Sequence, residues 1–451
     1  MDTGSTAWIL AATTAVMLMV PGLALFYGGM VGVRNVLNMI MMTFGAFAVV
    51  GVLWVVFGYS AVFGDSYGGL GLLGDVTEHA GLGGLLAEDP DATIPPALFA
   101  AFQLLFAGIT VALISGAFAD RLKYSAWLVF AAVWAILVYF PVAHWVFSFD
   151  LPDSGVVGGW IVNDLKVVDF AGGTAVHINA GAAALALVLV LGKRRGFPRD
   201  VQRPHNLPLV VLGAGILWFG WLGFNGGSAL AANNSASVVV LNTITAACAG
   251  ICAWLLVEKV RDGHATTLGA ASGAIAALVA ITPACGAVSP LGALAVGAAA
   301  GAICPLAIVL KFRFGYDDAL DVVGVHLVGG ILGTVLVGIL GTAAAPSAQD
   351  GLLYGGGFDL LGRQALAALV VTAYSFVVSL IIAKVIDLAM GLRVDEATEH
   401  EGLDISSHAE SGYDLDQLSS GRRSAARGGE QHTTGRPAVD VPQPVPTGAD
   451  R

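Results

Sequence analysis

The sequence has 451 residues, of which 56% are hydrophobic and only 12% are charged. Soluble domains carry about 25% charged residues, so charge this sparse excludes a water-soluble globule of this length and indicates an all-α integral membrane protein. The formal net charge of −11 argues against a nucleic-acid partner.

Eleven predominantly apolar runs follow one another along the chain, and each is long enough for a transmembrane α-helix, which needs about 20 residues. No basic region precedes the first run, so we expect a retained span and not a cleaved signal peptide. Four cysteines show no CxxC spacing, and we interpret them as buried packing residues. In chain order the expected spans are 7–30, 35–62, 95–119, 124–147, 170–192, 206–230, 236–258, 267–285, 289–311, 321–343 and 363–390.

Lysines and arginines are distributed unequally between the two sets of alternating loops. One set carries twelve of them, whereas the other carries only Lys166 and Arg363. Because basic residues accumulate in cytoplasmic loops, the amino terminus is predicted to lie outside and the carboxyl terminus in the cytoplasm. We therefore expect a multi-pass protein of the cell (plasma) membrane.

The fifth and tenth spans begin with the same pattern, an aspartate eight residues before a histidine. Asp169 precedes His177 in the fifth span, and Asp318 precedes His326 in the tenth. The first and sixth spans also share a Phe-x-Gly-Gly motif at their ends. Consecutive halves of five spans enter the membrane from opposite sides. Spans 1–5 and 6–10 are therefore predicted to form an inverted repeat, with an eleventh helix outside it.

The two histidines, His177 and His326, are candidate pore residues. Each lies about 12 Å from the start of its span, near the middle of a hydrocarbon core about 30 Å thick. A single histidine is often a packed core residue, but two at symmetry-related depths favour a solute path. Neutral imidazoles can exchange hydrogen bonds and protons in an apolar lumen. Because no cysteine or carboxylate lies near them, the ligand set is incomplete and neither a metal nor a cofactor is expected.

Polar and aromatic residues near the predicted outer surface suggest a cation site. Asp169 precedes a Gly-Gly-Thr helix start, where a carboxylate caps free amides, and its charge would also draw a cation to the outer mouth. Aromatic residues are dense at 102–106, 144–147 and 218–224. Rings beside a hydroxyl can hold a small cation, although packing and an interfacial aromatic belt are alternative interpretations.

The composition changes after the last predicted span, which divides the chain into three parts. Residues 1–390 form the expected transmembrane domain. Residues 391–418 keep apolar residues among acidic ones and are predicted to be a cytoplasmic regulatory segment, whereas residues 419–451 are poor in large apolar residues and are predicted to be disordered.

Six motifs resemble those of the Amt/Mep/Rh ammonium transporter family, and the likeness extends from the first span to about Leu415. The motifs are PGLALFYGGM (21–30), DFAGGTAVHINA (169–180), GILWFGWLGFNGGSA (215–229), TLGAASGAIAALVAITPACG (267–286), DDALDVVGVHLVGG (317–330) and GLRVDEATEHEGLDISSHAESGY (391–413). The resemblance implies a homotrimer with one pore in each subunit. It also implies regulation by a cytoplasmic PII-type signalling protein that acts at the carboxyl segment.

The same resemblance implies roles for individual residues. Phe106 and Phe224 match a stacked phenylalanine gate, and His177 and His326 match a twin-histidine pair. Ser228 matches the hydroxyl of the outer recruitment site, and Asp169 matches the acid needed for cation recruitment or deprotonation. Trp221 and Thr282 match positions in the pore vestibule. Phe147 departs from the pattern, because many members have tryptophan in the outer site. Since tryptophan is the best cation–π partner, this departure puts the affinity of the outer site in question.

These expectations combine into an ammonium transporter or channel. It would recruit NH4+ at the outer aromatic site, deprotonate it and conduct NH3, with or without the proton, through the twin-histidine pore, because an intact cation is costly in an apolar constriction. An ammonium sensor and a cation-coupled secondary transporter of another small solute are the alternatives. An enzyme is not expected, because the sequence offers no arrangement of nucleophile and base.

Overall fold

The computed structural model of the protein describes residues 1–87, 89, 92–199 and 203–413. These residues form helices and loops, with isolated β-bridges and no strand among them. Eleven of the described helical segments are long and apolar enough to cross a membrane, which confirms the predicted number of spans. Their ends lie within four residues of the predicted bounds. The tail 419–451, predicted to be disordered, lies outside the described residues.

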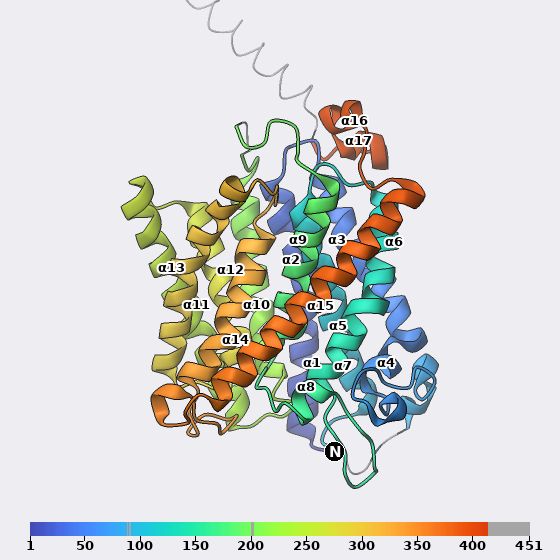
Figure 1. The fold of residues 1–451 in the computed structure, drawn as a ribbon, viewed down its shortest axis with the longest axis vertical. Coiled ribbons are helices and arrows are strands. Elements are labelled where there is room, and N and C mark those ends of the chain that lie inside the picture. Colours follow the sequence, from blue (N-terminus) through green and yellow to red (C-terminus); the bar gives the residue numbers. More distant parts are fainter. Residues whose placement is uncertain (88, 90–91, 200–202, 414–451) are drawn as a thin grey trace, which may run out of the picture. The chain divides into compact units, whose positions relative to one another are not determined.

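The helical body comprises Met1–Glu410. Its first five spans form one half (Figure 1). The second span is interrupted by a π-helical turn at Trp54–Gly58 and the fourth by one at Ala135–Tyr139. The short helix α8 (Trp160–Asn163) lies in the loop before the fifth span. The helices of these spans are α1 (Thr3–Met17), α2 (Met19–Met30), α3 (Val36–Leu53), α4 (Tyr59–Phe63), α5 (Pro96–Ile114), α6 (Tyr124–Trp134), α7 (Phe140–Phe147) and α9 (Asn179–Leu191).

The second half repeats this arrangement with the opposite sense. The loop that leads into the sixth span lies at the end of the body opposite to the start of α1 (Figure 1). Helices of the two halves also pack directly on each other, as α2 does on the sixth span. The helices of this half are α10 (Leu207–Gly227), α11 (Asn234–Asp262), α12 (Thr267–Ala284), α13 (Pro290–Phe314) and α14 (Val328–Leu340).

Side chains cap the helices of the second half at their amino ends. Asn233, Thr266 and Ser289 immediately precede α11, α12 and α13, and each accepts a hydrogen bond from a backbone N–H three residues further on. A cap satisfies one of the four free N–H groups of the first helical turn, so these polar residues fix where the spans begin.

The fifth and tenth spans cross at the centre of the body. Each begins with a π-helical turn, Gly173–Ile178 and Val323–Leu327, and the two turns contact each other. A Cβ atom on Gly181 would collide with the backbone nitrogen of Leu327, and one on Gly330 would lie 3.1 Å from the Gly173 carbonyl oxygen. Glycine at these positions lets the two spans approach closely.

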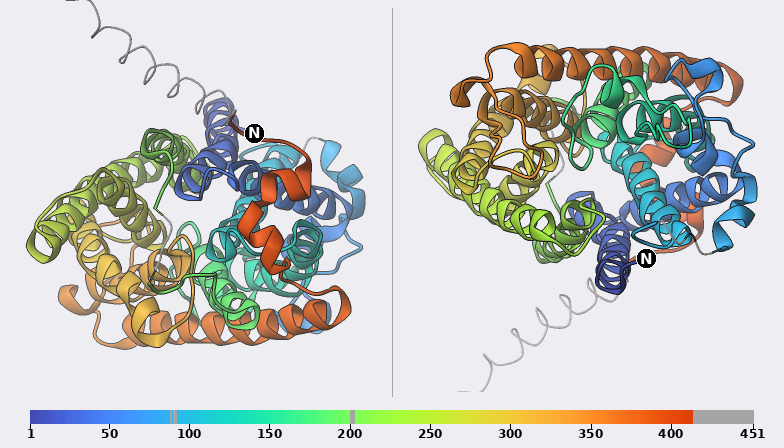
Figure 2. Two further views of the ribbon diagram at one scale, coloured as in Figure 1. Left: turned by 90° about the horizontal axis from the view of Figure 1, so that it is seen from above. Right: turned by 90° about the horizontal axis from the view of Figure 1, so that it is seen from below.

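The eleventh span, α15 (Asp359–Met390), stands outside the repeat. It runs diagonally across both halves (Figure 1) and lies along one flank of the body (Figure 2). It packs against α6, α9 and α14 and so bridges the two halves.

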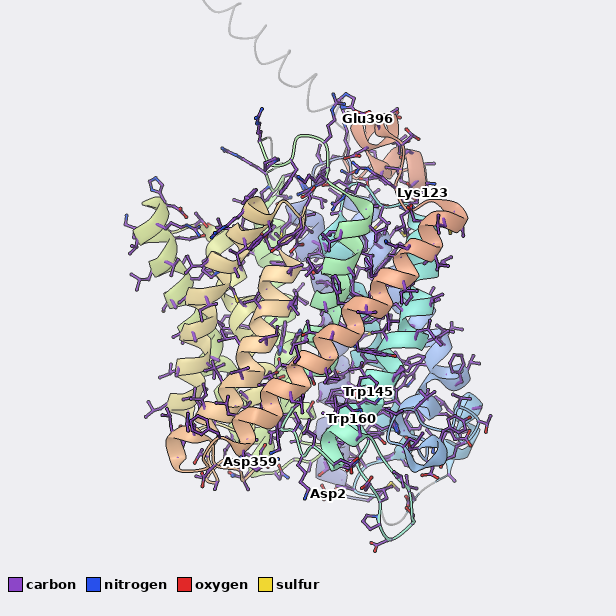
Figure 3. All side chains as sticks on the ribbon, viewed as in Figure 1. Asp2, Lys123, Trp145, Trp160, Asp359 and Glu396 are labelled. Atoms are coloured by element: carbon purple, nitrogen blue, oxygen red, sulfur yellow. The ribbon has the colours of Figure 1, made fainter. Side chains whose placement is uncertain are left out.

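Two short helices, α16 (Glu396–Glu401) and α17 (Leu403–His408), follow the last span. They lie at the same end of the body as Lys123, whereas Asp2 and Asp359 lie at the opposite end (Figure 3). The carboxyl segment is therefore folded against the loops at one end of the helical body, at least as far as residue 408.

The interpretation of the cysteines as buried packing residues is half wrong. Cys285 and Cys304 are buried, but Cys248 and Cys252 are exposed one turn apart on α11. A hydrophobicity pattern cannot separate these cases, because both faces of this helix are apolar.

Candidate functional site

A stacked pair of phenylalanines stands between two cavities in the helical body. The rings of Phe106 on α5 and Phe224 on α10 have centroids 3.9 Å apart and an interplanar angle of 18°. Phe106 lines a cavity of about 890 Å³, which we call the vestibule. Phe224 lines a cavity of about 20 Å³, which we call the lumen. A solute moving from the vestibule to the lumen must displace or pass these rings.

The vestibule brings together four of the residues predicted for the outer site. Phe147, Asp169 and Ser228 line it together with Phe106. The ring of Phe147 meets that of Phe106 edge to face, with centroids 6.4 Å apart. The Ser228 hydroxyl donates to the carbonyl oxygen of Phe224 at 2.8 Å, which leaves its lone pairs free to accept a hydrogen bond. Aromatic faces beside a hydroxyl acceptor suit a small cation that donates hydrogen bonds.

Asp169 caps the π-helical turn that opens the fifth span. Its carboxylate accepts backbone N–H groups of Gly172 at 2.9 Å, Gly173 at 2.6 Å and Thr174 at 2.7 Å, as well as the Thr174 hydroxyl. Both oxygens are therefore engaged, and the carboxylate is fixed in place. Its negative charge still lies at the vestibule, so a capping role and an electrostatic role are compatible.

The lumen is narrow and almost entirely apolar. A cavity of about 20 Å³ has room for roughly one water-sized molecule. His177 and His326 supply the only imidazoles that line it among the described residues. The other residues that line it are Met19, Leu23, Phe26, Tyr27, Ile109, Leu113, Val176, Leu217, Trp221, Phe224 and Ile275.

The two histidines face each other, as the repeated pattern predicts. Their side chains belong to residues only 1% and 4% exposed, and their Nδ1 atoms lie 3.2 Å apart. A hydrogen bond between these atoms needs one N–H and one lone pair, so His177 and His326 cannot both be imidazolium ions. The Nε2 atom of His177 is buried without a hydrogen-bond partner among the described residues. This nitrogen is therefore available to form a hydrogen bond with a solute in the lumen.

Trp221 packs against the ring of His177, and Thr282 holds Trp221 in place. The indole of Trp221 stacks on His177, with centroids 5.6 Å apart, and its Nε1–H donates to the Thr282 hydroxyl at 2.9 Å. Thr282 in turn donates to the carbonyl oxygen of Leu278. Both Trp221 and Thr282 are predicted at the pore vestibule, but Trp221 lines the lumen and Thr282 is not among the residues that line either cavity.

The tenth span is capped like the fifth. The Asp318 carboxylate accepts the backbone N–H groups of Val322 at 3.1 Å and Val323 at 2.7 Å. Lys311 donates to the backbone oxygen of Asp318 and pairs with the Asp321 carboxylate. Burial raises the pKa of the Asp318 carboxyl to about 7, although the charge of Lys311 opposes that rise. Asp318 thus caps the tenth span, whereas the Asp321 carboxylate forms an ion pair with Lys311.

Several lining residues were not singled out from the sequence. Phe26 and Tyr27 line the lumen, and the Tyr27 hydroxyl donates to the Leu113 carbonyl oxygen at 2.9 Å. Their place in the PGLALFYGGM motif was the available signal. In the vestibule, His79 stacks edge to face on Tyr59. His79 comes from a loop, where no periodicity indicates which side chains point inward.

The sequence and the fold are similar to known proteins. The profile of the Ammonium Transporter Family matches residues 7–413. The chain is 56% identical over 436 residues to an ammonium transporter of Mycobacterium tuberculosis, covering 92% of this chain and 91% of that one. The crystal structure of Saccharomyces cerevisiae Mep2 matches with a TM-score of 0.79 and 34% identity over 88% of each chain. A sensor Amt protein matches with a TM-score of 0.81 and 28% identity, covering 90% of this chain and 98% of that one.

Proposed function

Because the chain belongs to the ammonium transporter family, we propose that it recruits NH4+ in the vestibule, removes its proton and conducts NH3 through the two-histidine lumen. The observation that carries this mechanism is the stacked pair of Phe106 and Phe224 between a cavity that suits a cation and one that suits a small neutral molecule. The change in cavity character supports a change in the charge of the solute at that point.

The energetics of the lumen favour ammonia over ammonium. An intact cation would lose its hydration among apolar side chains, which costs several kcal/mol or more without compensating charge. The histidine pair holds one hydrogen bond internally and offers the buried Nε2 of His177 to a guest. Ammonia both donates and accepts hydrogen bonds, so it can use either tautomer of the pair.

Reconstitution in liposomes tests the function. An ammonium gradient imposed on proteoliposomes is expected to change internal pH much faster than in protein-free liposomes, and simultaneous current recording shows whether charge accompanies the nitrogen. An equal potassium gradient should give no comparable response. Ammonium flux no faster than in protein-free liposomes, from correctly folded protein, would refute the proposed transport.

An ammonium sensor is the second candidate, because one solved structure with this fold is a sensor Amt protein. The folded carboxyl segment, α16 and α17, would be the element that reports on occupancy. The same liposomes separate the two functions, since a dedicated sensor would change the contacts of this segment when ammonium is added and carry little flux.

Phe147 is expected to limit the affinity of the vestibule for the cation. Phe147→Trp should lower the half-saturating ammonium concentration by roughly threefold to tenfold, because cation–π attraction differs among rings by about 1 kcal/mol. Initial uptake rates of labelled methylammonium over a concentration series measure this. Phe147→Leu is the matched change in the other direction and should raise that concentration. An unchanged or higher value in Phe147→Trp would exclude the ring from the cation site.

We propose that the carboxyl segment 391–418 regulates transport, with a PII-type signalling protein as its partner, and that 419–451 is dispensable. Contacts of the segment support this proposal. Leu403 donates its backbone N–H to the Asn35 amide oxygen at 2.8 Å, and Asp404 accepts the backbone N–H of Asn38 at 2.8 Å. Burial raises the pKa of the Asp404 carboxyl, as expected for an acid enclosed where the carboxyl segment meets α3.

Deleting residues 419–451 is therefore expected to leave methylammonium uptake close to that of the full chain. Deletion from residue 403 onward should instead alter uptake and abolish binding of a purified PII-type protein, because it removes the hydrogen bonds to Asn35 and Asn38. Uptake normalised to the amount of inserted protein is the measurement. Complete loss of uptake in the shorter deletion, with normal insertion, would contradict the division.

We also propose a homotrimer with one complete path in each subunit and with the α16 end in the cytoplasm. The residues of one chain suffice to line both the vestibule and the lumen, so a path needs no side chain from a neighbouring subunit. Native mass spectrometry checks the stoichiometry. Labelling of single cysteines placed on either side of the membrane checks the orientation.

A further inference from the structure

A further cavity lies where three segments meet at the α16 end of the body, away from the vestibule and the lumen. It has a volume of about 620 Å³, within the range of small-molecule sites. The loop after α2 contributes Arg34, the loop after α9 contributes Arg194 and Arg195, and the carboxyl segment contributes Glu399 and His400. We call it the junction cavity.

The acidic residues of the junction cavity are already neutralised. Asp120 accepts a hydrogen bond from the Asn35 amide at 2.6 Å and lies 3.6 Å from the Arg194 guanidinium. Glu399 pairs with Arg393 at 2.7 Å and also accepts the backbone N–H of Arg195 at 3.0 Å. Neither carboxylate is left to compensate a further positive charge.

Two guanidinium groups remain uncompensated in the same cavity. Arg34 and Arg195 are both exposed, and their side chains form no ion pair or hydrogen bond among the described residues. Arg194 differs from them, because its guanidinium is ion-paired with Asp317 through three hydrogen bonds. Like charges facing one cavity repel each other, and a guanidinium presents a planar set of donors that matches phosphate or carboxylate oxygens.

The residues that line the junction cavity also form the joint between the carboxyl segment and the loop after α2. Gly402 lines the cavity, and a Cβ atom there would collide with the Arg34 side chain, so the segment lies directly against this loop. Asp404 donates its backbone N–H to the Arg34 carbonyl oxygen at 3.0 Å. A ligand in the cavity would contact both sides of the joint at once.

We propose that the junction cavity binds a small anion carrying phosphate or carboxylate groups, held by Arg34 and Arg195, and that its binding stabilises the folded carboxyl segment. The regulatory consequence rests on the proposed role of that segment, whereas the binding site does not. A soluble metabolite and the headgroup of an acidic lipid share this chemistry and are separated by experiment.

Isothermal titration of the full-length protein with sodium pyrophosphate, in neutral detergent at constant ionic strength, tests the site. Saturable binding of one anion per chain is expected, and the double variant Arg34→Gln/Arg195→Gln should bind at least about tenfold more weakly. Arg313→Gln is the matched control, because Arg313 is exposed on α13 but does not line the cavity. Arg195→Gln alone should give an intermediate loss and serves if the double variant does not fold.

The site is refuted if pyrophosphate does not saturate the wild-type protein, if the double variant binds as well, or if Arg313→Gln weakens binding equally. Titration in nanodiscs identifies the source of the anion. Phosphatidylglycerol that lowers the apparent affinity for pyrophosphate, relative to zwitterionic lipid alone, would identify a lipid headgroup, and an unchanged affinity would identify a soluble anion.

Hydrogen exchange measures the coupling to the carboxyl segment. Pyrophosphate should slow exchange of the Leu403 and Asp404 amides in wild type, with no effect in the double variant. If pyrophosphate binds without slowing this exchange, the proposed stabilisation of the carboxyl segment is wrong, but the binding site still stands. None of these assays needs transport, so failure of ammonium flux in liposomes would refute the proposed function separately.

Discussion

Replacing both His177 and His326 with leucine is expected to lower ammonium flux by at least about tenfold, equivalent to about 1.4 kcal/mol on the barrier. The change removes the Nδ1 to Nδ1 hydrogen bond and the free Nε2 of His177, the imidazole groups of the lumen. A solute that must leave water would then cross an apolar passage without a partner. Proteoliposome flux, measured as internal pH change together with current, gives the result.

A buried histidine outside the pathway supplies the control for this prediction. His144 is fully buried, lines neither the lumen nor the vestibule, and donates its Nδ1–H to the Val62 carbonyl oxygen at 2.7 Å. His144→Gln keeps a donor there and should retain wild-type flux per folded protein. Wild-type flux and selectivity in a well-assembled double leucine variant would show that His177 and His326 serve only in packing.

Asp169→Ala is expected to nearly abolish flux and to lower stability. It leaves the N–H groups of Gly172, Gly173 and Thr174 without their acceptor, and loss of a cap alone costs about 1–2 kcal/mol. It also removes the negative charge from the vestibule. Flux in liposomes and thermal unfolding in detergent, measured on the same preparation, report the two effects.

Two asparagine variants distinguish the effect of the Asp169 charge from the effect of its capping hydrogen bonds. Asp169→Asn retains an oxygen acceptor but loses the charge, and Asp318→Asn makes the same change at the corresponding start of the tenth span. If the charge attracts the cation, Asp169→Asn should reduce flux more than Asp318→Asn at comparable stability, and mainly through a higher half-saturating concentration. Equal losses in the two variants would leave only the capping role.

The fold was predictable because a bilayer imposes a simple requirement on the sequence. Every backbone polar group in hydrocarbon must be paired within a helix, so each span needs about 20 apolar residues in succession. That requirement placed all eleven spans within four residues of their observed ends. The repeated spacing of Asp169 to His177 and Asp318 to His326 then indicated two related halves of opposite sense.

The site was predictable only in part, since a one-dimensional pattern does not say which side chains meet. Phe106, Phe147 and Phe224 were assigned to one site by resemblance, and their convergence is a property of how α5, α7 and α10 pack. Thr282 was expected to face the vestibule but lies behind Trp221, because the indole needs a buried acceptor and takes the place next to His177.

The sequence by itself determined the membrane-spanning class, the number of spans and the inverted repeat with one histidine in each half, because hydrophobic length and residue spacing are properties of the chain alone. Tertiary structure decided that the histidines touch, since glycines at Gly181 and Gly330 let two spans from different halves cross closely. It also decided that the carboxyl segment closes a cavity over Arg34 and Arg195. Such features join residues far apart in the sequence, as in the hydrogen bond between Asn35 and Leu403, which are 368 positions apart, and only packing brings them together.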